Sequence, residues 1–389
     1  MKHLHYFFVI FLIFNSLCTY AQDETNAKSD PTATVVGTLD TKLNGTSSLF
    51  LWDGDYWTCP DHGTLGLYAL DTLTAEISRR IVTPVTINDM EAVAHDDDYF
   101  YFGDFGNNAE PERTDLRILR IAQADLLDSI YHFDTIFFTY PDYHPAGSKL
   151  YAETDFDCEA MIAAGDSLYL FTKQWNLYRT TCYALPKIPG NHTAVKRATH
   201  DVEALVTDAC YLPKQRILAL CCYNSMAQPV VWLFYDFQGT DFFRGQKVKV
   251  HLSNGVGTQT EGISTRDGMH YYLTNEKFSG MGSSRPAQLL QLDLSSYLYD
   301  YLYPDTTQHE GIAVPQTSYA TVFPNPTYGS VEVQCDGGVS CVEVYDIAGV
   351  KVAEVKSNTI DLASLHAGLY FLSITDKRGR IATQQVVKQ

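Results

Sequence analysis

A five-residue theme recurs five times along the chain, and this repetition limits the folds that the sequence can adopt. Each copy runs polar residue, any residue, glutamate, alanine or glycine, apolar residue, as at positions 89–93. The glutamates of the five copies are Glu91, Glu159, Glu203, Glu261 and Glu310. A repeating unit of about 40–50 residues that is rich in short strands is typical of the blades of a β-propeller. Equivalent positions of such blades face one axis, so the sequence predicts that these glutamates converge.

The stretches between the copies favour strands. Short aromatic or apolar runs, such as residues 99–103 and 269–274, follow turn residues such as Asp267-Gly268. Helical signal is limited to one or two turns near residues 122–128. The five motifs define five blades, and the strand-like region near residues 52–70, which has no motif, supplies one more. The sequence therefore predicts an all-β fold with a six-bladed β-propeller over residues 34–315. We expect strands from residues 34–60 to close the ring with strands near residues 310–320, because closure removes free sheet edges.

The beginning of the chain has the features of an export signal. Lys2 precedes a short apolar core at residues 7–14, and small residues end at Ala21, so residues 1–21 are predicted to be a secretory signal peptide cleaved near Ala21. The core is too short for a transmembrane span. A lipid anchor at Cys18 is the less favoured alternative, because the large Leu17 fits a lipid-attachment box poorly. Residues 22–33 are polar and are predicted to be a flexible leader.

The formal net charge of the chain is −18 at pH 7. The last seventy or so residues are nearly neutral, so the excess of acidic residues lies in the middle of the chain. A strongly acidic domain is a poor partner for nucleic acid, whose phosphates require Lys and Arg. It is better suited to binding cations.

The sequence pattern changes after a linker at residues 316–321. Residues 322–329 read Val-Phe-Pro-Asn-Pro-Thr-Tyr-Gly, and two blocks follow at 342–352 and 360–372. These blocks, in this order, resemble the C-terminal sorting domain (type A) of Bacteroidetes type IX secretion cargo. The resemblance implies that residues 322–389 form a small antiparallel β-sandwich that is recognised by the type IX secretion machinery. It also implies a secreted or outer-membrane surface location.

The middle domain resembles a second group of proteins. Residues 57–63, 88–94 and 99–108 are similar to motifs of secreted six-bladed Bacteroidetes β-propellers, which are distantly like the esterase-like phytase and SdiA-regulated proteins. His62 stands where those proteins usually have serine. The resemblance implies a fold rather than an activity, because one fold supports many functions.

The candidate ligand-binding residues are the motif glutamates and the polar loop that follows the first of them. They are Asp89, Glu91, Asp104, Asn107, Asn108, Glu159, Glu203, Glu261 and Glu310. Calcium takes about six to eight oxygen ligands, and converging glutamates offer such ligands, so Glu91, Glu159, Glu203, Glu261 and Glu310 are candidate calcium ligands. The structural alternative is that each glutamate accepts backbone N–H bonds and anchors its own blade. No catalytic residue is assigned.

These observations favour a secreted or cell-surface binding module that takes a glycan, a peptide or a cation at its acidic channel mouth. The alternative is a calcium-assisted hydrolase, either a phosphoesterase or a glycosidase. Asp89 and Glu91 stand two residues apart and therefore face the same side of a strand. Glycosidases also use paired carboxyl groups.

Overall fold

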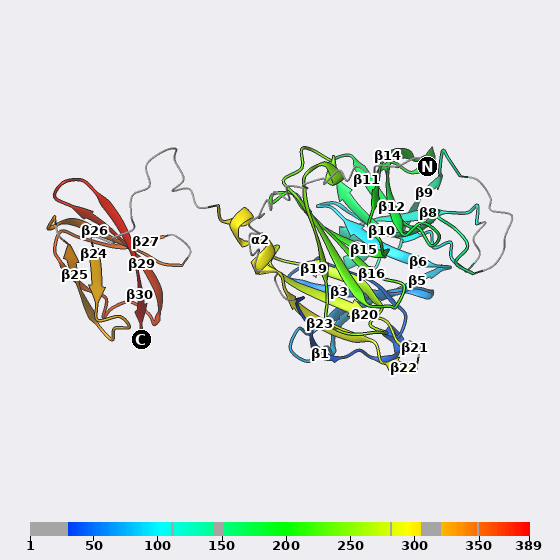
Figure 1. Cartoon of the computed structure of the whole chain (residues 1–389). Coiled ribbons are helices and arrows are strands. Elements are labelled where there is room, and N and C mark those ends of the chain that lie inside the picture. Colours follow the sequence, from blue (N-terminus) through cyan, green and yellow to red (C-terminus); the bar gives the residue numbers. More distant parts are fainter. Residues whose placement is uncertain are drawn as a thin grey trace, which may run out of the picture. The chain divides into compact units, whose positions relative to one another are not determined.

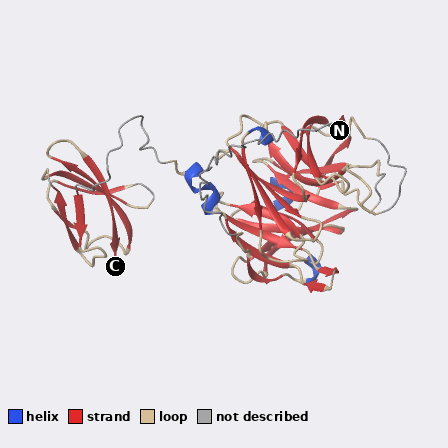
Figure 2. Cartoon of the chain, viewed as in Figure 1, coloured by secondary structure: helices blue, strands red, loops and turns tan. Residues whose placement is uncertain are grey.

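The chain forms two compact units, one ending at Asp305 and the other beginning at Thr306. The computed structural model describes residues 30–109, 113–143, 151–280, 282–304, 320–335, 337–347 and 350–389. The predicted signal peptide and Glu310 lie outside these residues. Strands dominate both units (Figure 2). None of the helices within the described ranges is long and apolar enough to span a membrane.

The first unit is a β-propeller of five blades, each built on a four-stranded antiparallel sheet (Figure 1). The first blade contains β2 (Thr46–Trp52), β3 (Asp55–Pro60), β4 (Gly63–Leu70) and β5 (Ile77–Ile87). The second contains β6 (Met90–His95), β7 (Tyr99–Asp104), β8 (Arg117–Ala122) and β9 (Asp134–Thr139), to which β13 (Gly190–Thr193) adds in parallel. The third contains β10 (Asp157–Ala164), β11 (Ser167–Lys173), β12 (Arg179–Pro186) and β14 (Val195–Asp201).

The fourth blade contains β15 (Leu205–Leu212), β16 (Ile217–Tyr223), β17 (Pro229–Tyr235) and β18 (Gln246–His251). The fifth contains β19 (Thr260–Thr265), β20 (His270–Asn275), β23 (Gln288–Asp293) and β1 (Thr34–Thr38). The innermost strands β2, β6, β10, β15 and β19 contact one another in this order, and β19 contacts β2. These contacts form a closed ring.

The ring is closed by the first strand of the chain. β1 pairs antiparallel with β23, so the fifth blade combines the N-terminal end of the propeller with its C-terminal end (Figure 1). An N-terminal strand was expected to do this, but its partner is at residues 288–293 rather than near 310–320. After Asp293 the chain forms the helix α2 (Ser295–Leu302), whose Leu298 is buried between the fourth and fifth blades.

The predicted all-β class and the propeller are confirmed, but the described residues form five blades rather than six. Four glutamate motifs lie at or just before the innermost strands β6, β10, β15 and β19. The innermost strand β2 has no motif, as predicted for one blade. The sixth blade was inferred from the motif at Glu310, which lies outside the described residues.

Apolar side chains fill the space between neighbouring blades. One buried cluster lies between each adjacent pair, and the cluster between the first and second blades contains Trp57, Met90 and Phe100. The cluster between the third and fourth contains Phe171, Leu220 and Phe234. Aromatic side chains bury large areas each, which explains why an aromatic-rich sequence suits this architecture.

A few short elements lie between the strands of the first unit. They are the helix α1 (Gln123–Leu127), the 3₁₀ turns η1 (Thr41–Leu43) and η2 (Phe242–Arg244), and the hairpin of β21 (Phe278–Gly280) and β22 (Ser283–Arg285). The short helix agrees with the one or two helical turns expected near residues 122–128.

The second unit is a small β-sandwich, as predicted. One sheet contains β24 (Ala320–Phe323), β25 (Ser330–Cys335) and β28 (Thr359–Asp361). The other contains β27 (Lys351–Val355), β26 (Val339–Tyr345), β29 (Gly368–Asp376) and β30 (Ile381–Lys388). Alternate residues of both sheets, among them Val331, Val342 and Leu372, form its buried core.

Candidate functional site: an acidic mouth on the propeller axis

Every innermost strand of the propeller carries a β-bulge near its start. The pairing register with the second strand of the blade slips by one residue at Ser47, Glu91, Glu159, Thr207 and Glu261. A bulge leaves one residue out of the ladder and changes the direction of its side chain. Five equivalent side chains are therefore set apart at the same end of the ring, and three of them are glutamates.

The three bulge glutamates converge. Glu91, Glu159 and Glu261 are only 7%, 2% and 6% exposed. Burial, followed by repulsion from Glu159, raises the pKa of Glu91 well above its usual value. Burial also raises the pKa of Glu159, and repulsion from Glu261 adds to this effect. We call these three residues the acidic floor.

One buried lysine partly neutralises the acidic floor. The Nζ atom of Lys173, at the end of β11, lies 3.0 Å from Oε1 of Glu159. It also lies 4.7 Å and 5.0 Å from the ring centres of Trp175 and Tyr223, which allows cation–π contact. Burial alone would lower the pKa of Lys173, but the carboxylate of Glu159 raises it, so the lysine is charged.

Half-buried residues next to the acidic floor form a group that we call the rim. The rim consists of Asp61, Asp89, Asn108, Trp175, Gln259 and Glu276. The side-chain amide of Gln259 donates to Oε1 of Glu261 at 2.8 Å and to Oε1 of Glu276 at 2.6 Å. Asn108 donates to Oε1 of Glu159 at 3.3 Å. Because the rim is partly exposed, solvent reaches the edge of the acidic cluster.

The rim carboxyl groups also have raised pKa values. Burial, with repulsion from Asp157, raises the pKa of Asp89 to about 6. Burial, with repulsion from Glu261, raises the pKa of Glu276 to about 8. The carboxyl groups of this mouth therefore hold their protons to higher pH than free carboxyl groups do, because they cannot all be ionised so close together.

A glycine allows this close packing around the first floor glutamate. A side-chain carbon built on Gly106 would overlap the carboxyl groups of Asp89 and Glu91. The backbone N–H of Gly106 donates to the carbonyl oxygen of Asp89 at 3.0 Å. The loop can therefore lie against the two carboxyl groups only because residue 106 has no side chain.

Two of the predicted ligand-binding residues support the site from below. Asp104 is fully buried, and its Oδ2 accepts hydrogen bonds from Nε and Nη2 of Arg117 at 2.9 and 2.7 Å. Its Oδ1 accepts the backbone N–H of Asp89 at 3.0 Å. The backbone N–H of Asn107 donates to Oδ1 of Asp157 at 2.7 Å, and the Asn107 side chain is fully buried. Both residues position the loop and do not line the mouth.

The predicted convergence of Glu203 is wrong. Its side chain is 74% exposed and forms an ion pair with Lys249 at 2.8 Å. The equivalent bulge position of the fourth blade is Thr207, four residues further along. The motif at residues 201–205 thus resembles the others in sequence but lies before the strand.

The two hydroxyl residues of the bulge set have the anchoring role that was considered for the glutamates. Oγ of Ser47 donates to the carbonyl oxygen of Met90 at 2.6 Å, and Oγ1 of Thr207 donates to that of Thr260 at 2.7 Å. Each bond joins one blade to another. Among the described residues, the carboxyl groups of Glu159 and Glu261 accept hydrogen bonds from the side chains of Asn108 and Gln259 rather than from backbone N–H groups.

Sequence reasoning missed several residues of the mouth. The missed residues are alike in register, because each follows the second-strand residue that pairs with the residue just before the bulge. They are Asp61, Lys173, Tyr223 and Glu276. They share a position that becomes visible only when the hairpin register is known. Gln259, by contrast, begins its own copy of the motif, so its position relative to Glu261 was a usable signal.

The arrangement does not form an evident metal-binding set. Among the residues that the structure describes, no group of three or more His, Cys, Asp or Glu side chains is placed to hold a metal ion. The acidic floor nevertheless has the oxygen donors that calcium prefers. Calcium at this mouth therefore stays a prediction.

The fold and the mouth define a β-propeller joined to a separate β-sandwich. Residues 321–389 match the family described as the secretion system C-terminal sorting domain. This match confirms the predicted sorting domain, and the chain is type IX secretion cargo. No curated protein matches the chain in sequence.

Solved structures similar to this chain include a surface component of a secretion system, a WD40 β-propeller domain and a designed protein. PorZ, a bacterial surface component of the type IX secretion system of Porphyromonas gingivalis, is 11% identical over 88% of this chain, with a TM-score of 0.33. This chain spans 45% of the PorZ chain. The WD40 β-propeller domain of Doa1 is 11% identical over 92% of this chain and 97% of its own, with a TM-score of 0.30. The computationally designed Ika8 protein is 10% identical over 91% of this chain and 100% of its own, also with a TM-score of 0.30.

Proposed function

We propose that the exported propeller is a binding module that takes a cationic ligand at its acidic mouth. The observation that carries this proposal is that Glu91, Glu159 and Glu261 converge at bulge positions without anchoring the backbone. Buried carboxyl groups that do not stabilise the fold in this way are costly to maintain. A ligand that neutralises them explains their presence.

The charge balance of the mouth favours a cation over a neutral or anionic ligand. Lys173 supplies one positive charge to the floor, whereas Asp89 and Glu276 add acidic groups at the rim. The raised pKa values mean that these carboxyl groups hold protons to higher pH than free carboxyl groups do. A bound cation would displace these protons, so its affinity should rise with pH.

Two kinds of cation fit this chemistry. Calcium would use the carboxylate oxygens, as predicted from the sequence. An organic ammonium group, such as a lysine side chain of a peptide, would be held as Lys173 is, between carboxylates and aromatic rings. Both belong to the same proposal and are separate arms of its test.

The experiment is isothermal titration calorimetry of the purified chain with calcium chloride and with n-butylammonium chloride, at pH 6 and pH 8. We expect saturable binding of at least one cation, tighter at pH 8. Glu91→Gln and Glu261→Gln should weaken it at least about tenfold. Glu203→Gln is the matched control, because this motif glutamate lies outside the mouth. Absence of binding by both cations, or equal affinity in Glu261→Gln, would overturn the proposal.

A hydrolase remains the second candidate because of two pKa values. Asp89 and Glu276 have pKa values of about 6 and about 8, close to those that suit proton transfer at neutral pH. The test is a screen with p-nitrophenyl phosphoesters and p-nitrophenyl glycosides, with and without EDTA. Turnover that Glu276→Gln abolishes without lowering the melting temperature would support this function. Absence of turnover on all substrates would reject it for these bond classes.

A further inference from the structure

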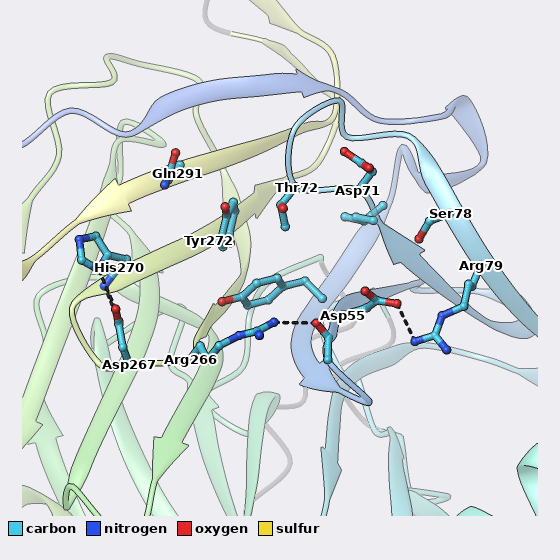
Figure 3. Close-up of a pocket in the computed structure, with 13 residues that line it drawn as sticks. Asp55, Asp71, Thr72, Ser78, Arg79, Arg266, Asp267, His270, Tyr272 and Gln291 are labelled. Carbon is cyan, nitrogen blue, oxygen red and sulfur yellow. Dashed lines mark hydrogen bonds and ion pairs between the residues drawn. The ribbon is translucent and has the colours of Figure 1, made fainter. Parts of the chain in front are cut away.

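A second site lies away from the axis, between the first and fifth blades where the ring is closed. It is a pocket of about 610 Å³, which we call the interblade pocket. Figure 3 shows Arg266, His270 and Tyr272 on one side of it and Asp71 and Arg79 on the other. Small-molecule sites commonly have volumes of about 300–1,000 Å³.

Two tyrosines form the aromatic part of the pocket. The ring centres of Tyr56 and Tyr272 are 4.6 Å apart, with the planes tilted by 49°. Tyr56 is 5% exposed, whereas Tyr272 is half-buried and presents part of its ring to the pocket. Burial raises the pKa of Tyr56 to about 12, so its hydroxyl group is neutral.

The charged groups of the pocket are mostly compensated. Arg79 forms ion pairs with Asp53 at 2.8 Å and with Asp55 at 2.6 Å. Nδ1 of His270 lies 2.7 Å from Oδ2 of Asp267. The pocket therefore has no large excess of either charge, unlike the acidic mouth.

Arg266 supplies a hydrogen-bond donor and Asp71 an acceptor to the lining of the pocket. Arg266 is exposed, donates from Nη2 to the carbonyl oxygen of Gly54 at 2.6 Å, and forms no ion pair with a carboxylate in the described part of the chain. Across the pocket, Oδ1 of Asp71 accepts the backbone N–H groups of Leu73 and Thr74. These bonds lower the pKa of Asp71, so this carboxylate is ionised.

This combination matches the chemistry of a sugar ring. One face of a pyranose presents C–H groups, which pack on an aromatic ring, and its hydroxyl groups both donate and accept hydrogen bonds. We propose that the interblade pocket binds a neutral carbohydrate, with a sugar ring against Tyr272 and its hydroxyl groups bonded to Arg266 and Asp71. A strongly charged ligand is disfavoured because the positive and negative charges that line the pocket are balanced.

The test is titration of the purified chain with four neutral disaccharides: maltose, cellobiose, xylobiose and mannobiose. Saturation-transfer NMR and calorimetry measure the binding. Glucuronate and glucosamine are the charged comparisons. We expect at least one neutral disaccharide to bind saturably in the millimolar range. Tyr272→Ala and Arg266→Ala should each weaken binding at least about tenfold, and Tyr272→Phe should retain it.

The matched control is Arg216→Ala, which removes an arginine that is ion-paired with Asp236 on the fourth blade. It should leave sugar binding unchanged. Melting temperatures of all variants separate loss of binding from loss of folding, and Arg266→Ala changes an exposed residue. The proposal is overturned if no neutral saccharide binds, if only the charged sugars bind, or if binding survives Arg266→Ala in a folded protein. These results are independent of cation binding at the acidic mouth.

Discussion

Individual carboxyl groups of the acidic mouth lower the stability of the folded chain as the pH rises. Glu276 shows how, because burial and its neighbour Glu261 raise its pKa from the usual 4.5 to about 8. Between these two values the carboxyl group is protonated in the folded chain but ionised in the unfolded chain. Unfolding therefore releases a proton, and a rise in pH across this range favours unfolding.

The first prediction follows from this destabilising effect of rising pH. The melting temperature should fall as the pH rises from about 5 to about 8, and Glu276→Gln should make this fall smaller, because glutamine cannot ionise. Differential scanning calorimetry at several pH values measures it. Glu203→Gln is the control, since Lys249 lowers the pKa of the exposed Glu203 and the substitution should not flatten the profile. A profile of Glu276→Gln as steep as that of the wild type would contradict the assignment.

Asp104 gives a second prediction at the scale of one residue. Asparagine has nearly the same shape but no charge, so Asp104→Asn leaves the guanidinium group of Arg117 without its buried partner. Breaking a buried ion pair in this way typically costs about 3–5 kcal/mol. Urea unfolding should show a loss of this size. Asp134→Asn, which affects the more exposed pair with Arg120, should cost at most about 1 kcal/mol. Equal losses in the two variants would refute a supporting role for Asp104.

At the scale of strands, the sequence predicted much of the propeller because its signals are local. Alternating aromatic runs and turn residues marked the hairpins, and three of the glutamate motifs marked the bulge positions of β6, β10 and β19. Glu203 failed because a bulge is a property of pairing: only the register of β15 against β16 shows that Thr207 is the equivalent residue. The same reason hid Lys173, whose position depends on where β11 ends against β10.

The closing strand allows a prediction at this scale. β1 is the outer strand of the fifth blade, and without it β23 would expose an unpaired edge. A chain beginning at Leu39 should therefore melt at least roughly 5 °C lower than one beginning at Asp30. It should also aggregate more readily on heating, as light scattering would show. If the two chains melt at the same temperature, β1 does not contribute to closing the ring.

The whole molecule combines a propeller, which carries both proposed binding sites, with a β-sandwich that marks it for export. The sequence predicted the order of the blades along the chain but not their number. The fifth copy of the motif, at Glu310, predicted another blade, but the propeller is completed by returning to the first strand of the chain. Closure depends on contacts between distant segments, which a local motif does not report.

The division into two units gives the last prediction. Each unit has its own buried core, with Val331, Val342 and Leu372 in the sandwich and separate interblade clusters in the propeller. Domains with separate cores unfold separately unless a large interface couples them. Calorimetry of the chain beginning at Asp30 should therefore show two transitions. A chain of residues 30–304 should retain one of them at an unchanged temperature, together with cation and sugar binding. Val342→Asp in the full-length chain should remove only the other transition, because it places a charge in the core of the sandwich. The units would be coupled if calorimetry showed a single transition and if the truncation and Val342→Asp shifted its temperature equally.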